Sequence, residues 1–450
     1  MKKNLKIKYL SSILLILLFG ITANTNFIYA DSNIGIQNNI STYINEKPID
    51  FKEDKEKAKD WGKEKKKEFE NKLTKNEKKS LENYSKDVQT INSKFMELNY
   101  LSHKQLNKEQ LDTMKDLDKA LEKANVTESV ITYKPIEAEQ IGFNGRLFWN
   151  GESMPAEQAK FITQFKDKDI PLDSYLSTSL TTPSLSSDED VLLKVTVPKG
   201  GKGSPYTKVK GSVWTNKKSE YELILDQSYQ LHVTTIKQVV LKGKKCLQVE
   251  ADLKEVKDFK NDPNGKGERW GEDNYKDWAS TLDSEKENAL IDYLGFNGEE
   301  VNSYLRNNGI DNDKLDKQIE EMSEALEQHS IPENIIVYRR TGAEEFGLDP
   351  NKELTIGALE NVLLNQEFEQ KAYLSTSLSS EPKSFSGKKY ILRLLVPKGA
   401  TGAYISAMNN VPKTEKEILL DKGSRYKIQS IREVSIKGDY KYIINAILKV

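Results

Sequence analysis

The feature that most constrains the fold of this chain is a long internal repeat, which occupies most of its 450 residues. Five segments of the first half recur in the second half in the same order. The paired ranges are 60–85 with 269–294, 128–143 with 333–348, 173–180 with 371–378, 191–200 with 390–399, and 219–240 with 414–435. Ordered repetition over this length indicates a duplicated structural unit. We therefore expect two homologous domains.

The boundary between the two units is predicted in the segment 257–269, KDFKNDPNGKGER, which is polar, carries Gly and Pro, and has few apolar residues. Segments of this composition commonly separate domains. This places a first domain at 51–262 and a second at 263–450. Each has about 200 residues, a normal size for a single hydrophobic core.

Each unit changes character along its length. The first third is charged, lacks turn signals and has apolar residues at helical spacing, and 106–124 is a clear amphipathic helix. The rest contains short β-branched and aromatic runs bounded by Gly, Pro, Asn and Ser, such as IIVY and YILRLLVP. Helices followed by strands predict an α+β fold. We expect each domain to have an N-terminal helical part followed by a mixed β-sandwich core.

The N-terminus has the pattern of a signal peptide. Residues 1–30 combine a lysine-rich start, an apolar run and a small-residue end at Ala30. The apolar run is shorter than the roughly 20 residues that a spanning helix needs. We predict a secreted protein whose residues 31–50 form a flexible leader. No later stretch is apolar enough to span a membrane, and the single cysteine, Cys246, excludes an intrachain disulfide.

Several common kinds of site are not indicated. His103, His232 and His329 are the only histidines, and none has a neighbouring ligand at metal spacing, so we expect no metal. Neither a Gly-x-Ser-x-Gly elbow nor a phosphate-binding glycine loop occurs. Net charge falls from −1 to about −5 when 1–30 is removed, which implies no nucleic-acid partner.

Three features on predicted strands of the second unit could carry chemistry. Arg339 ends the run IIVYRR, and a guanidinium there could fork two hydrogen bonds onto a phosphate. In Ser375-Thr376-Ser377, strand alternation places both serines on one face. By the same alternation, Glu415 and Glu417 would share a strand face. Each feature alone also suits an ordinary surface arginine, a hydroxyl-rich strand or a charged sheet edge.

Taken together and in this order, the three features resemble the arginine, Ser-Thr-Ser and Glu-x-Glu signature of ADP-ribosyltransferase toxins. The chain is most similar to the enzymatic components of actin-modifying binary toxins of the iota and vegetative insecticidal classes. The resemblance extends over nearly the whole chain after residue 30 and includes the duplication and the segments at 270–278 and 345–348.

The resemblance implies transfer of ADP-ribose from NAD to a protein arginine. Glu417 would hydrogen-bond a ribose hydroxyl and stabilise the cationic transition state, and Ser375 would hold Glu417 in place. Arg339 would bind the NAD phosphate, and Glu415 would engage the acceptor guanidinium. Further NAD contacts are implied for Arg340, Tyr293, Phe385 and Lys388. The implied acceptor is host actin, reached in the host cytosol with the help of a separate pore-forming component.

Some residues depart from the family pattern. Lys388 stands where an arginine is expected, and Gly298 stands where relatives carry a second tyrosine near the nicotinamide. The loop 404–417 is one residue longer than usual and places Val411 near the position of an aromatic residue used in acceptor recognition. Alternatives therefore stay open: NAD hydrolysis, another acceptor such as a small GTPase, or a degenerate two-domain binding module without catalysis.

The first unit keeps part of the signature. It retains Ser177-Thr178-Ser179, Glu220 and Glu222, but Lys134 replaces the arginine, and a lysine cannot fork onto a pyrophosphate. The resemblance implies an inactive copy that binds the translocation component. A second active site is the alternative. We expect the protein alone to be a monomer that does not insert stably into membranes.

Overall fold

The computed structural model describes residues 47–202, 204, 206–215, 221–309, 312–381 and 386–450. The predicted signal peptide, most of the predicted leader, Glu220 and Phe385 lie outside the described residues. Ile49, near the end of that leader, pairs in parallel with Val130. The last residues of the predicted leader, 47–50, are therefore already bonded to the first domain.

The N-terminal part of each repeat is helical, as its periodicity predicts. The first repeat begins with α1 (Lys55–Glu70), α2 (Lys75–Lys86), α3 (Val88–Leu98) and α4 (Lys108–Glu122). The second begins with α6 (Lys266–Thr281), α7 (Ser284–Asp292), α8 (Gly298–Arg306) and α9 (Asp313–Glu327). The expected helix at 106–124 is α4, which Asn107 and Gln110 start with a capping box.

Strands follow the helices in both repeats. The first repeat has β1 (Val130–Ile136), β2 (Phe148–Trp149), β3 (Glu152–Ser153), β4 (Asp169–Pro171), β5 (Leu176–Ser179), β6 (Val191–Val197), β7 (Gly211–Trp214), β8 (Glu222–Leu225), β9 (Tyr229–Leu241) and β10 (Lys244–Glu255). The second has β11 (Ile335–Thr341), β12 (Glu367–Gln370), β13 (Leu374–Ser377), β14 (Tyr390–Val396), β15 (Gly402–Tyr404), β16 (Glu417–Leu420), β17 (Ser424–Ile436) and β18 (Asp439–Lys449).

The two domains have the same sheet topology. The eight-stranded orders are β4-β9-β10-β6-β1-β5-β8-β7 and β12-β17-β18-β14-β11-β13-β16-β15. Most neighbours are antiparallel, but β6 with β10 and β14 with β18 are parallel, so both sheets are mixed. The two halves of each sheet meet at a single residue pair, Tyr133 with Ser179 and Tyr338 with Ser377. This confirms the α+β class and the two homologous sheet-rich domains.

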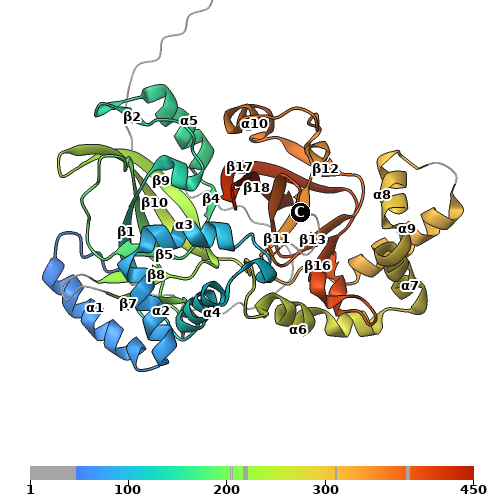
Figure 1. Ribbon diagram of the computed structural model, residues 1–450, viewed down its shortest axis with the longest axis horizontal. Helices are drawn as coiled ribbons and strands as arrows, with labels where there is room; N and C mark the ends of the chain where they lie inside the picture. Colours follow the sequence, from blue (N-terminus) through green and yellow to red (C-terminus); the bar gives the residue numbers. More distant parts are fainter. Residues whose placement is uncertain (1–46, 203, 205, 216–220, 310–311, 382–385) are drawn as a thin grey trace, which may run out of the picture. The chain divides into compact units, whose positions relative to one another are not determined.

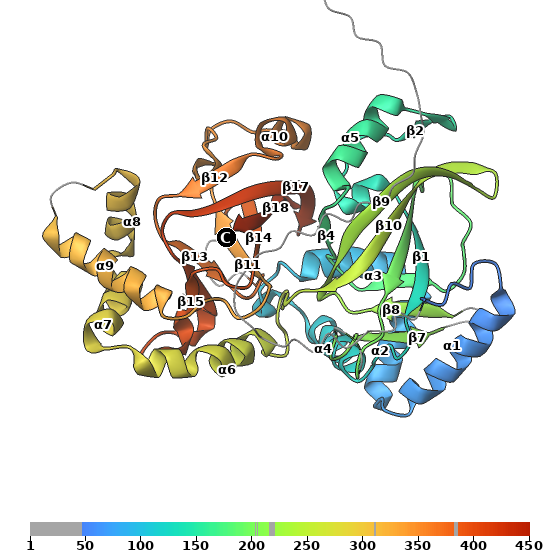
Figure 2. The ribbon, with the colours of Figure 1, turned by 180° about the vertical axis from the view of Figure 1, so that it is seen from behind.

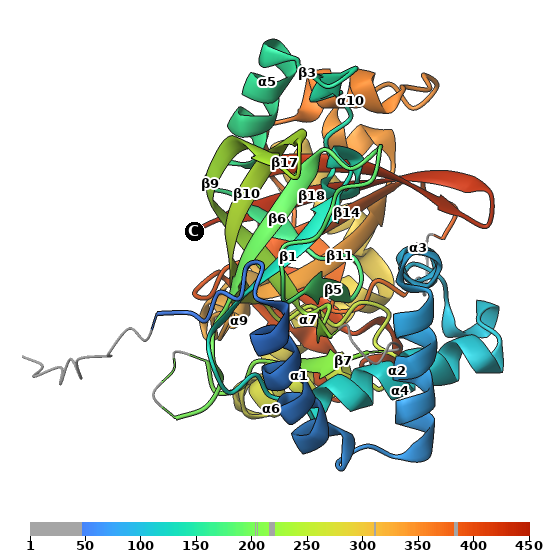
Figure 3. The ribbon, with the colours of Figure 1, turned by 90° about the vertical axis from the view of Figure 1, so that its left-hand side faces the viewer.

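One helix in each repeat interrupts the strand region and was not expected from the sequence. These are α5 (Pro155–Phe165) and α10 (Ile356–Leu363). In all three ribbon views they lie at the ends of the two sheets away from α1 and α6 (Figures 1, 2 and 3). The duplication thus extends to α5 and α10, whose sequences show no clear similarity.

The repeated Trp-Gly pair joins the first helix of each domain to its sheet. The indole N–H of Trp61 donates to Glu128 at 2.8 Å, and that of Trp270 donates to Glu333 at 2.6 Å. A Cβ on Gly271 would lie 2.4 Å from the ring of Tyr404, so only glycine allows this helix to approach. The Trp-Gly pair therefore sets how closely the first helix of each domain packs on its sheet.

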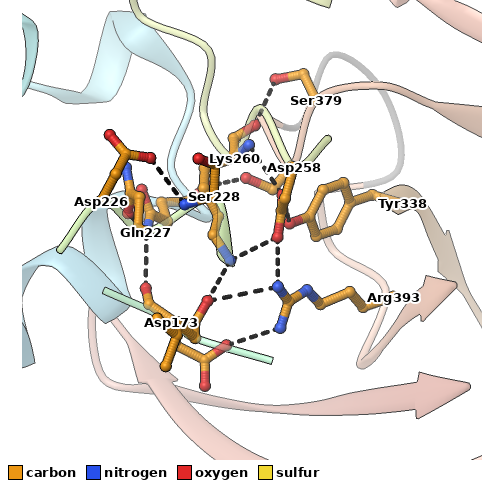
Figure 4. A network of polar contacts seen from close by, with 12 residues as sticks. Asp173, Asp226, Gln227, Ser228, Asp258, Lys260, Tyr338, Ser379 and Arg393 are labelled. Atoms are coloured by element: carbon orange, nitrogen blue, oxygen red, sulfur yellow. Dashed lines mark hydrogen bonds and ion pairs between the residues drawn. The ribbon is translucent and has the colours of Figure 1, made fainter. Parts of the chain in front are cut away.

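The predicted boundary segment is a buried polar junction and not an open linker. Residues 46–450 form one compact unit. At its centre, the Asp258 carboxylate binds the Arg393 guanidinium, lies 2.6 Å from the Lys260 ammonium, and accepts from the Tyr338 hydroxyl at 2.6 Å (Figure 4). Arg393 also pairs with Asp173 of the first domain at 3.3 Å. Charges buried this deeply need such partners.

Candidate active site

A cavity of about 570 Å³ opens beside the central strands of the second sheet. Its walls come from the α7–α8 region, from β11, from β13 and the segment after it, and from the start of β16. It is lined by Tyr293, Leu294, Gly298, Glu299, Asn302, Arg306, Tyr338, Arg339, Arg340, Ser375, Thr376, Ser377, Ser379, Ser380, Glu381, Ile391, Glu415 and Glu417. The three features that the sequence singled out therefore meet in one place.

The Ser-Thr-Ser segment lies as strand alternation predicts. Thr376 is buried and donates to the Ile418 carbonyl at 2.7 Å, while Ser375 and Ser377 face the cavity. The Ser375 hydroxyl donates to the Glu417 carboxylate, and the Ser377 hydroxyl donates to the Glu415 carbonyl at 2.7 Å. One serine thus holds the side chain of one glutamate, and the other holds the backbone of the second.

The expectation that Glu415 and Glu417 share a strand face is wrong. Strand β16 begins only at Glu417, and Glu415 ends a 3₁₀ turn, Lys413–Glu415. Lys416 between them is left-handed, with φ of +49°, and its ammonium pairs with Asp262. Alternation applies only within a strand. The two carboxylates nevertheless lie close enough that the charge of Glu415 raises the pKa of Glu417.

Glu417 has a strongly perturbed carboxyl group. Its pKa is raised to about 7, mainly by burial and also by the negative Glu415, although the Ser375 hydroxyl and the Arg339 cation both lower it. Part of its surface remains accessible from the cavity, while protein packs closely around the rest. A desolvated carboxylate next to a like charge is a common property of catalytic sites.

Arg339 is fixed at the cavity wall by two partners. Its Nη1 donates to the Ser375 carbonyl at 3.0 Å, and its Nε donates to Glu345 at 3.3 Å. Glu345 also accepts from Thr341 at 3.1 Å and from Gln370 at 2.9 Å. The guanidinium is thereby oriented in advance, and an oriented guanidinium can fork two hydrogen bonds onto a phosphate.

Arg340 is held mainly by backbone carbonyls, one of them from the first domain. Its Nη2 donates to the Tyr100 carbonyl at 2.8 Å and to the Ser380 carbonyl at 3.3 Å. Burial lowers the pKa of Arg340 to about 10, so it stays cationic at neutral pH. Beside it, the His103 backbone N–H donates to Glu381, another cavity residue, at 2.9 Å. First-domain residues after α3 therefore support this wall of the cavity.

The remaining predicted site residues differ in their placement. Tyr293 lines the cavity, and its hydroxyl accepts from Asn302 at 2.9 Å. Gly298 also lines it, and a Cβ there would lie 2.5 Å from the Tyr293 carbonyl, because the turn Tyr293–Asn297 is a π-helix. Lys388 is exposed and does not line the cavity. Phe385 lies outside the described residues.

The described residues hold no cluster of three or more His, Cys, Asp or Glu side chains that could bind a metal. His103 and His232 instead contact the carboxylates of Glu381 and Asp169, at 3.5 and 2.7 Å. Within the same part of the chain, no helix has the length and apolar character needed to cross a membrane.

The corresponding position in the first domain is altered at more than one residue. Lys134, Pro135 and Gln140 stand opposite Arg339, Arg340 and Glu345 of the repeat. Glu222 begins β8 as Glu417 begins β16, but it accepts from Ser85, at the end of α2, at 3.2 Å. Both arginines and the glutamate that orients the first are therefore missing from this copy.

Comparison with known proteins assigns the family. The sequence profile of the ADP-ribosyltransferase exoenzymes matches residues 58–255 and again 267–450. The chain belongs to the ADP-ribosyltransferase exoenzyme family. Both copies of the repeat are matched, so the duplicated unit is a domain of this family. NAD is the substrate of ADP-ribosyltransferases.

Solved structures show the same two-domain architecture. The ADP-ribosylating toxin BECa, from a binary enterotoxin of C. perfringens and crystallised with NADH, is 30% identical, with a TM-score of 0.74 over 90% of this chain and 100% of that one. The enzymatic component C2-I of the C2-toxin from Clostridium botulinum is 27% identical, with a TM-score of 0.69 over 89% of this chain and 99% of that one.

A curated relative shares only one domain's length. The NAD(+)–arginine ADP-ribosyltransferase EFV of Enterococcus faecalis is 27% identical over 173 residues. The match covers 37% of this chain and 34% of that protein, so the chain spans about a third of its length.

The sequence did not point to Glu345, which orients Arg339, or to several residues that line the cavity, but the repeat contains a signal for Glu345. Glu345 lies in the segment 345–348, which contributes to the family resemblance. Its replacement by Gln140 in the same copy that replaces Arg339 by Lys134 links the two positions. Asn302, Arg306 and Glu381 carry no such signal, because only the folded chain brings them to the cavity.

Proposed function

We propose that this chain is a secreted toxin enzyme that transfers ADP-ribose from NAD to an arginine of a host protein and releases nicotinamide. The observation that carries the proposal is the second-domain cavity, in which Arg339, Ser375, Glu415 and Glu417 converge. Membership of the family supports the transfer chemistry. The arginine specificity is supported by the Glu-x-Glu pair and by the name of the enterococcal relative.

In the proposed reaction, the bond between ribose C1′ and the nicotinamide nitrogen breaks, and its electron pair leaves with nicotinamide. Positive charge develops on the ribose, and ionised Glu417, held by Ser375, stabilises it. Arg339 and Arg340 bind the pyrophosphate. A guanidino nitrogen of the acceptor forms the new bond to C1′. Glu415 orients the acceptor guanidinium and accepts the proton that it loses.

We propose host actin as the acceptor. The full-length similarity to enzymatic components of clostridial binary toxins supports it. The acceptor side of the site is also where this chain departs from the expected pattern. Gly298 lines the cavity. Val411, in the loop 404–417, is partly buried and packs against the hydrophobic core of the second domain. A small GTPase as acceptor, or water, would give the alternatives stated above.

For the first domain we propose a role in binding a separate pore-forming component, which would carry the enzyme into the host cytosol. The loss of both arginines and of Glu345 from this copy supports an inactive site. The first domain has the same eight-stranded sheet as the second but lacks both arginines and the glutamate, and a retained fold without these residues supports a binding role.

The test uses the purified chain with labelled NAD and host-cell lysate. We expect one labelled protein of actin's size, and purified actin labelled on arginine. Label on another protein would replace actin, and free ADP-ribose without labelled protein would indicate hydrolysis. Glu417→Gln should abolish the reaction, whereas the matched Glu222→Gln should not change it. Activity that survives Glu417→Gln and disappears only when Glu222→Gln is added would favour a second active site in the first domain.

A further inference from the structure

The carboxylate of Asp262 connects the segment between the domains to the Glu-x-Glu turn. Asp262 is almost fully buried. Its Oδ1 accepts from the Lys266 N–H at 2.5 Å and its Oδ2 from the Gly267 N–H at 3.1 Å, so it satisfies the first two N–H groups of helix α6, whose N-cap residue is Gly265. The same Oδ2 binds the ammonium of Lys416, which is also buried. One side chain thus holds both a helix terminus and the residue between the two glutamates.

Lys416 needs this support because its backbone is strained. A φ of +49° is unusual for a residue that has a Cβ, and such a conformation persists only where surrounding contacts impose it. The turn is closed on both sides: the Lys416 N–H donates to the Lys413 carbonyl at 3.3 Å, and its carbonyl accepts from Leu378 at 3.0 Å. Because Lys416 is left-handed, the backbone changes direction between Glu415 and strand β16.

We propose that Asp262 is a positioning residue that, by holding Lys416, sets the place of Glu415 relative to Glu417 and so favours transfer to arginine over hydrolysis of NAD. This inference rests on the proposed function. Glu417 lies within β16 and is held separately, since its side chain binds Ser375 and its N–H donates to Ser406 at 3.0 Å. Glu415 lies before the strand, and its position depends on the turn.

The two activities should therefore respond differently. Cleavage of the nicotinamide bond needs Glu417, whether water or a guanidinium takes the ribose. Only transfer also needs a carboxylate placed to orient the guanidinium and to accept its proton. A looser turn should reduce transfer and leave hydrolysis nearly intact.

In the described part of the first domain, the residue that matches Lys416 and the residue that caps the first helix have other partners. Tyr221 takes the place of Lys416 and packs against Gly62, where a Cβ would lie 2.7 Å from the ring. The residue that caps its first helix, Asp54, accepts from the Lys57 N–H at 3.2 Å and pairs with the Lys57 side chain at 2.9 Å. Among the described residues, the copy without the arginine pair thus shows no ion pair between the start of its first helix and the residue that matches Lys416.

The experiment compares Lys416→Met, Asp262→Asn and the control Asp54→Asn in the full chain. Lys416→Met is the cleaner change, because Asp262 keeps both of its backbone donors at the start of α6. For each variant we would measure transfer to agmatine, a small guanidino acceptor, hydrolysis of NAD without an acceptor, and deuterium uptake by the segment 404–417. Lys416→Arg, which keeps the charge, serves as the conservative variant.

We expect the ratio of transfer to hydrolysis to fall at least tenfold in Lys416→Met and Asp262→Asn, with faster exchange in 404–417. Lys416→Arg should recover most of the ratio, and Asp54→Asn should match the parent chain. An equal loss of both activities, or unchanged exchange in 404–417, would overturn the inference. If the parent chain modifies no guanidino acceptor, the proposed function fails, and the exchange data alone decide whether Asp262 fixes the turn.

Discussion

Replacing Ser375 by alanine tests whether the protonation of Glu417 controls the reaction. Burial raises the pKa of Glu417 to about 7 even though the Ser375 hydroxyl, which donates to the Glu417 carboxylate, lowers it. Only the ionised carboxylate can stabilise the ribose cation. For the parent chain, kcat/KM for NAD hydrolysis should therefore fall about tenfold per pH unit below about pH 7, because the pH dependence of kcat/KM reports the pKa values of the free enzyme.

The expected shift follows from the strength of the lost bond. A hydrogen bond to a charged group contributes about 1.5–3 kcal/mol, and each pKa unit corresponds to about 1.4 kcal/mol. Ser375→Ala should therefore move the acid limb upward by about 1–2 pH units. Near pH 7 the variant should lose about 5- to 50-fold in kcat/KM, because a smaller fraction of Glu417 is ionised, and it should recover most of this at pH 9.

The assay is NAD hydrolysis without an acceptor, measured from pH 5.5 to 9.5. Ser377→Ala is the control, because that hydroxyl lies on the same strand face but donates to the Glu415 carbonyl. Its acid limb should stay in place. A Ser375→Ala profile that is lowered by the same factor at every pH would refute the electrostatic argument and leave Ser375 with a role in placement only.

Three further outcomes follow from the contacts described. Glu345→Gln should raise KM for NAD about tenfold, because Arg339 loses a charged partner that orients it. KM would be measured by initial-rate kinetics, and an unchanged value would contradict this prediction. Arg393→Met should reduce the free energy of unfolding by about 3–5 kcal/mol, since it leaves buried Asp258 without a main partner; denaturant melts that match the parent chain would contradict this. The charges of Lys260 and Arg393 lower the pKa of Asp258 to about 2, so the stabilisation that its carboxylate provides should be present above about pH 4 and lost as pH falls from about 4 to about 2. Calorimetry at pH 3 and 6 should compare the parent chain with the double variant Arg393→Met/Asp258→Asn. The difference in stability between the two should be smaller at pH 3.

The parts of the fold that the sequence predicts are those determined locally. The Ser375-Thr376-Ser377 segment obeys strand alternation, because it lies inside a paired strand. The helix α4 begins and ends near its predicted bounds, because its cap and its apolar spacing are both encoded in adjacent residues. The repeat itself then extends each of these local conclusions to the other domain.

The parts that failed depend on residues far away in the chain. Glu415 and Glu417 do not alternate, because Lys416 is left-handed and its partner Asp262 lies about 150 residues earlier. The support of Arg340 by the Tyr100 carbonyl crosses 240 positions and involves a backbone atom, which no side-chain pattern encodes. Helix α5 was missed because its few apolar residues, such as Phe161 and Phe165, sit in a region read as strands.

The contacts of the first domain with the cavity wall affect how activity should return when the unfolded chain refolds. Arg340 is held by the Tyr100 carbonyl, and the Glu381 carboxylate accepts from the His103 N–H at 2.9 Å. A second domain that folds first would still lack these partners. Catalytic activity should therefore appear only when the two domains dock, so its half-time reports assembly of the pair and not the folding of either sheet. A fragment beginning at residue 263 would never complete that step.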